Sequence, residues 1–381
     1  MFPPAFRSLS AQRLPAAFAS LNKARDSVVA SPLRGVDGEP VALDYSFRTA
    51  IQSSGNVLIN DMHDSRIVMF DVNGKFLAAA GRKGSGPGEF QSRSSLLRLR
   101  ADSIGVYDVT LQRLSIFDPR LKFVRTEALM PPSGTQGYNT VEGQFENGSL
   151  VVLHKRPSYG KPDGVHKNTS VLLVARKNGT WSRLELPSFT ELTVSMGSNT
   201  MSTRVPDSDI RTVAVCARGI VVVANNEITM YDTELVARSK PPFRGQVDTV
   251  RAGASFKVTY SQPPESPLEE KFRAAQEAAR PKVSISYSQI VVSADGLIWQ
   301  ALGKSLNGRF VRTTVSGAII DTVLAPYRVM HANGISSVAI GSHRDDEDMP
   351  AIMVRPKAQR TTSGKPVPAS PLGRCNATTS Y

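Results

Sequence analysis

The chain has 381 residues, 40% of them hydrophobic, which is enough to bury a sizeable core. Its formal net charge is +13 and its pI is near 9.9, which favours an anionic partner such as nucleic acid, membrane headgroups or an acidic protein. No apolar stretch is long enough to span a bilayer, and the basic N-terminal region lacks the apolar core of a secretory signal.

The N-terminal segment, residues 1–37, interleaves apolar and basic side chains and carries a net charge of +3. This pattern resembles an anchor that enters a groove or lies at a membrane interface. We expect the segment to be a tail outside the folded domain. Its candidate partner-binding residues are Phe2, Phe6, Arg7, Arg13 and Phe18.

From residue 50 onward, a strand pattern that ends in an aromatic–Asp pair recurs along the chain. The pair Phe70-Asp71 reappears 47 positions later as Phe117-Asp118, and a third copy ends in Tyr231 followed by Asp232. Self-similarity at this period indicates a repeat fold. Short apolar runs separated by turn-forming residues indicate four strands per repeat, which is typical of a propeller blade.

The turn signals predict an all-β fold, a six-bladed β-propeller over residues 38–356. The last blade is short of one strand, since its pattern ends at residues 351–354. We expect residues 41–50 to supply that strand, so that the N-terminal end of the domain closes the ring. The six blades are expected to begin near residues 50, 96, 143, 208, 284 and 330.

The first repeat and the Gly-rich run that follows it, residues 81–90, resemble the NHL-type six-bladed β-propellers of bacteria. In that family a third strand ends in an aromatic–Asp turn, and a Gly-rich stretch ending in Glu-Phe leads into the next blade. The resemblance is strong over residues 50–125, fair over residues 210–325 and absent from both tails. It implies a fold and a binding surface but no reaction.

Residues 266–280 interrupt the strand pattern and predict an inserted helix. Ser266 is a suitable N-cap, Pro267 takes the first helical position and Glu269 the third, and Pro281 ends the helix. The apolar face of this helix either covers a face of the propeller or serves as a lid or docking element.

We expect no catalytic residue, no cofactor and no metal site. Propeller enzymes place their ligands and catalytic groups around the central channel, from equivalent positions of several blades. The five histidines do not recur in this way, and the second-repeat position that corresponds to His63 is Thr110. The acidic run at residues 345–348 lacks the spacing of a calcium loop.

The positions of the two cysteines in the sequence give little information about whether they pair. Cys216 lies in a strand-like run and Cys375 lies near the C-terminus. A disulfide between them stays open, and the preferred interpretation is a buried thiol plus a tail thiol, which fits a reducing compartment.

The C-terminal segment, residues 357–381, is rich in Pro, Ser, Thr and Lys, a composition that does not order itself. Residues 355–381 carry five basic residues and no acidic one, so the two tails together hold +8 of the net charge. The second set of candidate partner-binding residues is Arg355, Lys357, Arg360, Lys365 and Arg374.

These patterns predict a non-catalytic scaffold subunit that docks, through its basic tails and a propeller face, on protein subunits of a larger membrane-associated assembly. An anionic membrane surface is a further expected contact, on the cytoplasmic side because no signal peptide is visible. Nucleic acid is not expected, since the repeat aromatics occupy core positions. The chain is similar in class to an extrinsic subunit of some bacterial photosynthetic reaction-centre and light-harvesting complexes, which implies such a partner. The alternative is a propeller enzyme, a lyase or hydrolase acting in the central channel.

Overall fold

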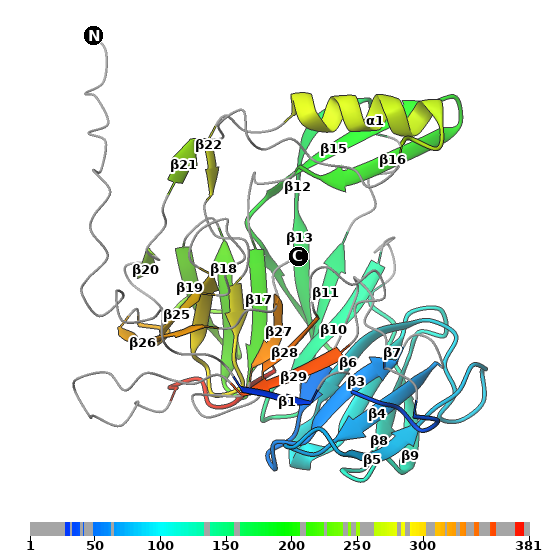
Figure 1. Cartoon of the computed structure of the whole chain (residues 1–381), viewed down its shortest axis with the longest axis vertical. Helices are drawn as coiled ribbons and strands as arrows, with labels where there is room; N and C mark the ends of the chain where they lie inside the picture. Colours follow the sequence, from blue (N-terminus) through cyan, green and yellow to red (C-terminus); the bar gives the residue numbers. More distant parts are fainter. Residues whose placement is uncertain are drawn as a thin grey trace.

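We analysed a computed structural model of the chain (Figure 1). The residues that it describes are 27–30, 33–38, 41, 49–61, 65–132, 138–155, 161–205, 211–224, 227–238, 243–244, 249–251, 263–279, 283–285, 290–301, 309–316, 318–324, 328–332, 339–342, 351–355 and 370–376.

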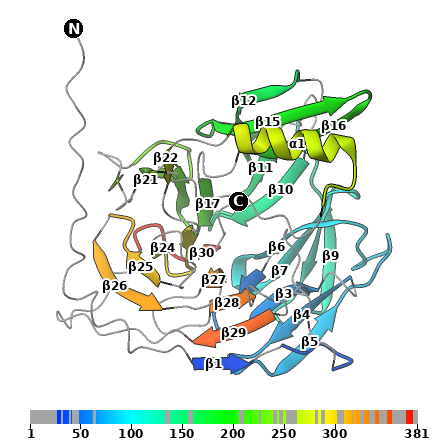
Figure 2. The same cartoon turned by 45° about the horizontal axis from the view of Figure 1, so that its top comes forward.

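Six antiparallel sheets are arranged in a ring and form the predicted propeller (Figures 1 and 2). Blade 1 consists of β2 (Thr49–Ile51), β3 (Val57–Asp61), β4 (Arg66–Phe70) and β5 (Phe76–Ala80). Blade 2 consists of β6 (Arg93–Arg98), β7 (Ile104–Asp108), β8 (Arg113–Phe117) and β9 (Phe123–Ala128). Blade 3 consists of β10 (Tyr138–Gln144), β11 (Leu150–Lys155), β13 (Ser170–Ala175) and β14 (Trp181–Glu185).

The second half of the ring follows the same plan. Blade 4 consists of β17 (Arg211–Cys216), β18 (Gly219–Ala224), β19 (Glu227–Asp232) and β20 (Phe243–Arg244). Blade 5 consists of β23 (Ile290–Val292), β24 (Ile298–Ala301), β25 (Arg309–Thr313) and β26 (Ile319–Leu324). Blade 6 consists of β27 (Arg328–Ala332), β28 (Ala339–Ser342), β29 (Ala351–Arg355) and β1 (Ser27–Ala30).

The first strand of each blade is its innermost strand, and each innermost strand contacts that of the next blade. The contacts run from β2 through β6, β10, β17, β23 and β27 back to β2, which closes the ring. The six innermost strands end at the same face of the ring. We call this face the turn face. Apolar clusters fill the spaces between adjacent blades, as between Leu58 of blade 1 and Phe117 of blade 2.

The aromatic–Asp repeat is confirmed. Phe70, Phe117 and Tyr231 lie near the ends of the third strands β4, β8 and β19, in equivalent places. The aspartate that follows each of them organises the next turn. Asp71 Oδ1 accepts the backbone N–H groups two and four residues later at 2.8 and 2.9 Å, and Asp118 does the same at the same distances. Asp232 repeats the pattern at 2.9 Å for both bonds. The repeat thus encodes a strand end and its turn together.

An N-terminal strand closes the last blade, as predicted, but it is formed by other residues than those expected. β1 pairs antiparallel with β29, and Val28 lies opposite Val354. The expected closing residues 41–50 include Thr49 and Ala50, which instead begin β2 and pair with β3 inside blade 1. The error has a physical source, because the short apolar run at residues 28–30 was assigned to a charged tail on the average composition of residues 1–37.

A small accessory unit stands on the face opposite the turn face (Figure 1, top). Its sheet contains β12 (Gly164–Asn168), β15 (Phe189–Met196) and β16 (Asn199–Arg204). β12 is inserted between two strands of blade 3, while β15 and β16 connect blades 3 and 4. Two short strands, β21 (Thr249–Arg251) and β22 (Val283–Ile285), pair separately.

The predicted helix exists as α1 (Pro267–Ala278), with Ser266 as its N-cap. Its buried side chain, Phe272, packs on Leu192, Val194 and Val205, so the helix covers the accessory sheet rather than a blade. Lys271 Nζ lies 2.7 Å from an Asp163 carboxylate oxygen and donates to the Ser195 carbonyl at 2.8 Å, which fastens the helix at its polar side.

Candidate functional site

The C-terminal segment at residues 370–376 lies inside the ring of blades. Its strand β30 (Cys375–Asn376) pairs with the innermost strand β17, on the channel side of blade 4 (Figure 2). The backbone N–H groups of Ala217 and Arg218 donate to this segment, each at 2.9 Å. The Cys375 N–H in turn donates to the Ala294 carbonyl of blade 5 at 2.8 Å. We call residues 370–376 the plug, because they occupy the channel at the turn face.

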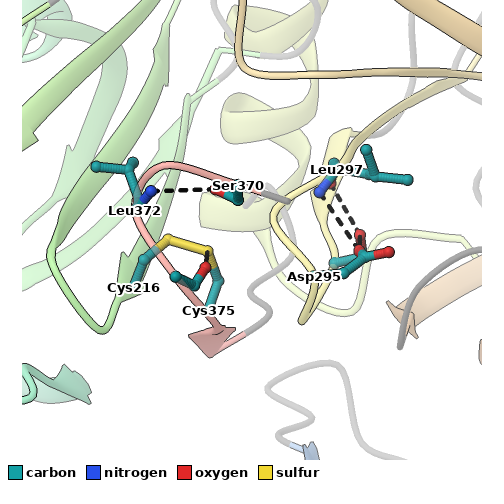
Figure 3. Close-up of a disulfide and its surroundings, with 8 residues drawn as sticks. Cys216, Asp295, Leu297, Ser370, Leu372 and Cys375 are labelled. Carbon is teal, nitrogen blue, oxygen red and sulfur yellow. Dashed lines mark hydrogen bonds between the residues drawn. A yellow bond between two sulfur atoms is a disulfide. The ribbon is translucent and has the colours of Figure 1, made fainter. Parts of the chain in front are cut away.

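A disulfide joins the plug to blade 4 (Figure 3). Cys216 and Cys375 are directly opposite each other in neighbouring strands and both are buried. The expectation of two free thiols was therefore wrong. The two residues are 159 positions apart, and no feature of the sequence indicates that the C-terminus returns to the channel. Leu372 packs beside the disulfide in the apolar cluster shared by blades 4 and 5.

Close approach of the plug requires a small residue in blade 3. A Cβ atom at Gly143 would lie 2.6 Å from the Val215 Cβ and 2.8 Å from the Asn376 amide nitrogen. Glycine at this position of β10 therefore leaves the space that the plug and β17 occupy.

Arg374 links the plug to blade 1. Its Nη2 donates to the Gln52 carbonyl at 2.8 Å, across the channel from the disulfide. Burial lowers the pKa of Arg374 and the nearby Arg98 lowers it further, while Asp102 and Asp295 oppose that shift. The predicted partner-binding residue Arg374 thus contacts blade 1 from within the ring.

Asp102 fixes the turn of blade 2 at the same face. Its carboxylate accepts the Ser53 backbone N–H at 3.1 Å, the Ser53 hydroxyl at 3.0 Å and the Arg98 guanidinium at 3.1 Å. Burial alone would raise the pKa of Asp102, but these hydrogen bonds and the Arg98 charge outweigh it and lower the pKa. The turn is left-handed, with φ of 52° at Ala101 and 56° at Asp102. Such a conformation costs roughly 1–3 kcal/mol per residue and persists only where its surroundings enforce it.

This turn forms one wall of a cleft between blades 2 and 3, which opens on the turn face. The cleft has a volume of about 610 Å³. Its floor is apolar and includes the buried side chains of Leu99, Ile116 and Leu150. Its rim is basic and carries Arg100, Arg125, Arg176 and Lys177, with Glu127 as the acidic member. We call it the basic cleft.

The four rim cations differ in what they contact. Arg125 lies 2.7 Å from Glu127, and both side chains are well exposed, so this pair is worth little. Arg176 is largely buried and holds Glu234 of blade 4 at 3.0 Å. Arg100 and Lys177 are exposed, and neither has an ion-pair partner within the part of the chain that the structure describes. These two cations are therefore available to a ligand.

Two of the predicted partner-binding residues, Arg355 and Arg374, lie in the described part of the chain. Arg355 is the last residue of β29, opposite Ser27 in blade 6, and Arg374 lies in the plug. The remaining eight lie outside the described residues: Phe2, Phe6, Arg7, Arg13, Phe18, Lys357, Arg360 and Lys365. Sequence reasoning missed Arg100 and Lys177, because both follow ordinary strands and nothing in their spacing brings blades 2 and 3 together.

Two histidines, His154 and His166, have side-chain contacts that the structure describes. His154 is buried, with Nδ1 2.9 Å from the Asn139 side-chain oxygen, and His166 contacts the Pro162 carbonyl on the surface. His63 lies outside the described residues. No group of three or more potential metal ligands occurs in the described ranges. Within the same ranges, no helix has the length and apolarity to cross a membrane.

A family model described as a six-bladed β-propeller matches residues 50–131. The match covers blades 1 and 2, which contain the two clearest copies of the repeat. Among curated protein sequences, none matches this chain at a significant level.

Solved structures resemble the chain over nearly its whole length at low sequence identity. One is an exported protein of Bacteroides fragilis, described as putative, with 13% identity, coverage of 90% of this chain and 97% of the other, and a TM-score of 0.46. A Bacteroides vulgatus protein from a family of unknown function has 10% identity, coverage of 90% and 100%, and a TM-score of 0.49. Virginiamycin B lyase from Staphylococcus aureus has 10% identity, coverage of 87% and 99%, and a TM-score of 0.40.

Proposed function

We propose that this chain is a non-catalytic binding propeller that serves as a scaffold subunit of a larger, membrane-associated assembly. The observation that carries the proposal is the plug. Leu372, Arg374 and Cys375 occupy the ring at the turn face, and hydrogen bonds to blades 1, 4 and 5 hold them there. An enzyme that works in the channel needs this space for substrate and catalytic groups, whereas a scaffold needs a rigid ring.

Charge supports an acidic partner. The net charge of +13 favours association with an anionic surface, and part of it lies at the basic cleft. The partner class that fits is an acidic protein subunit, with an anionic membrane surface as a second contact. The more specific proposal of a photosynthetic reaction-centre or light-harvesting partner rests on class resemblance alone, and identification of the native partner tests it.

The disulfide bears on the compartment. Buried disulfides form and persist in oxidising surroundings and are rare in a reducing cytosol. The Cys216–Cys375 bond therefore favours the oxidising side of the membrane over the cytoplasmic side expected from the sequence. Mass spectrometry of the native protein after thiol alkylation without reduction tests this, because free thiols at both positions would favour the cytoplasm.

The test of the function is isolation of the native protein after mild crosslinking, in a detergent that preserves membrane complexes. We expect it to co-purify at fixed stoichiometry with acidic protein subunits. A monomer that turns over small lactones or esters in an activity screen would instead support the alternative, an enzyme with a site in the channel.

A further inference from the structure

We propose that the basic cleft between blades 2 and 3 binds an acidic peptide segment of the partner, in an extended conformation with apolar side chains between its carboxylates. This inference rests on the proposed binding function and names its site. It also shifts the principal docking element from the tails to a surface of the propeller.

The positive charges at the rim favour a ligand with negative charge. The exposed cations Arg100 and Lys177 lie on opposite walls of the basic cleft, one from blade 2 and one from blade 3. A ligand carboxylate at either cation would form charge-assisted hydrogen bonds, which are roughly twice as strong as neutral ones. Arg125 can join them, since its exposed pair with Glu127 is readily exchanged.

The backbone around the cleft is built to hold these side chains in place. The left-handed turn that carries Arg100 is fixed to blade 1 by Asp102, and the Arg100 backbone N–H donates to the Gln144 side chain of blade 3 at 3.1 Å. On the other wall, a Cβ atom at Gly148 would collide with the Lys177 Cε. The Lys177 stem therefore lies against the Gly148 backbone.

The shape and floor of the cleft favour a peptide over other anions. A volume of about 610 Å³ is much larger than an inorganic ion needs and lies in the range of ligand-binding clefts. The apolar floor of Leu99, Ile116 and Leu150 offers burial to an aliphatic side chain. In an extended peptide that alternates acidic and aliphatic residues, the acidic side chains lie on one side of the backbone and the aliphatic side chains on the other.

The same features disfavour nucleic acid and lipid. Single-stranded nucleic acid is usually bound by aromatic side chains that stack on its bases. None of the described residues that line the cleft is aromatic. A flat lipid surface does not need a recess, since it would contact an exposed basic patch of the protein at least as readily as a recessed cleft. Both remain outcomes of the test below.

The probe is a fluorescent hexapeptide that alternates glutamate and leucine, measured by anisotropy against the full-length protein. Reversal of both free cations, Arg100→Glu with Lys177→Glu, should weaken binding by about tenfold or more, as the loss of about 1.4 kcal/mol or more implies. The matched control is Arg120→Glu with Lys122→Glu. It makes the same change in net charge at exposed positions of blade 2 outside the cleft, and it should bind like the wild type.

Three further arms decide the chemistry. A hexapeptide with glutamine in place of glutamate should lose binding, and one with alanine in place of leucine should bind more weakly. The cleft variant and the control variant should bind equally to vesicles of phosphatidylserine with phosphatidylcholine. They should also bind equally to a short single-stranded DNA. The proposal is overturned if the cleft variant binds the peptide like the wild type, if the control loses as much affinity, or if only vesicle or DNA binding depends on Arg100 and Lys177.

Two results distinguish failure of the basic cleft as the docking site from failure of the proposed scaffold function. If the cleft variant still co-purifies with the native assembly at wild-type occupancy, the scaffold role stands and the cleft is not its docking site. If the wild-type protein purifies alone and is catalytically active, the function itself is wrong.

Discussion

Arg312 and Asp321 face each other across neighbouring strands of blade 5 and form an ion pair from which water is almost fully excluded. Arg312 Nε donates to an Asp321 carboxylate oxygen at 2.6 Å, and Nη2 donates to the other oxygen. The guanidinium also lies over the Trp299 ring, 5.0 Å from its centroid. The pair thus joins β25 to β26 while the aromatic ring of β24 covers the cation.

Removal of one partner should therefore be costly. Asp321→Ala removes the carboxylate that pairs with Arg312 while the Arg312 charge stays buried, which should reduce the free energy of unfolding by about 3–5 kcal/mol. The double variant Arg312→Met with Asp321→Leu removes both charges and should be much closer to the wild type. Urea denaturation of both variants measures the difference. A double variant that is as unstable as Asp321→Ala would show that packing, and not the isolated charge, sets the cost.

The Asp102 network predicts a dependence of stability on pH. The pKa of Asp102 is lowered in the folded protein, so its stabilising contribution is full above the unfolded value of 3.8 and is lost as the pH falls through the lower folded value. Asp102→Asn should be less stable than the wild type at neutral pH, and the gap should narrow below about pH 4. Thermal unfolding at a series of pH values measures the gap. A gap that stays constant into the acidic range contradicts the network described here.

Closure of the ring by β1 sets the limit of N-terminal truncation. Deletion of residues 1–26 retains β1 and should leave the propeller folded. Deletion of residues 1–37 removes β1 and exposes the edge of β29, so this variant should lose stability and aggregate. Light scattering and thermal unfolding compare the two. Equal behaviour of both truncations would mean that β1 contributes little to closure.

The disulfide should stabilise the ring because it restricts a long loop in the unfolded chain. Cys216→Ser together with Cys375→Ser should reduce the free energy of unfolding by about 2–5 kcal/mol. The expected structural effect is release of the plug, measured as faster amide hydrogen exchange at residues 370–376 than in the wild type. Protection that is unchanged in the variant would mean that the hydrogen bonds of Arg374 and Cys375 hold the plug without the covalent bond.

The blades could be predicted because the repeat is a local signal. The predicted starts near residues 50, 96 and 330 are within three positions of the first strands of their blades, since aromatic–Asp turns and alternating runs depend on neighbours in sequence. Blade 5 was placed less well, with an expected start near residue 284 and an observed first residue of Ile290. That blade follows the insertion that contains α1.

The plug and the basic cleft could not be predicted, for a different physical reason. Composition describes what a segment can bury by itself, and residues 370–376 bury little alone. They are ordered by surfaces of blades 1, 4 and 5, which exist only after the ring has formed. The cleft likewise depends on two turns, at Arg100 and Lys177, that are separated in sequence and meet only through blade geometry.

Blade 6 draws three strands from residues 328–355 and its fourth from residues 27–30, so it contains the two ends of the propeller. During synthesis, β1 leaves the ribosome early and has no partner until β29 has also emerged. The pairing of β1 with β29 that closes the ring therefore joins segments more than 300 residues apart in the sequence, and contacts of such long range form slowly. Until that pairing forms, the edge of β29 is open, so the incomplete ring presents a strand edge to which other chains can add.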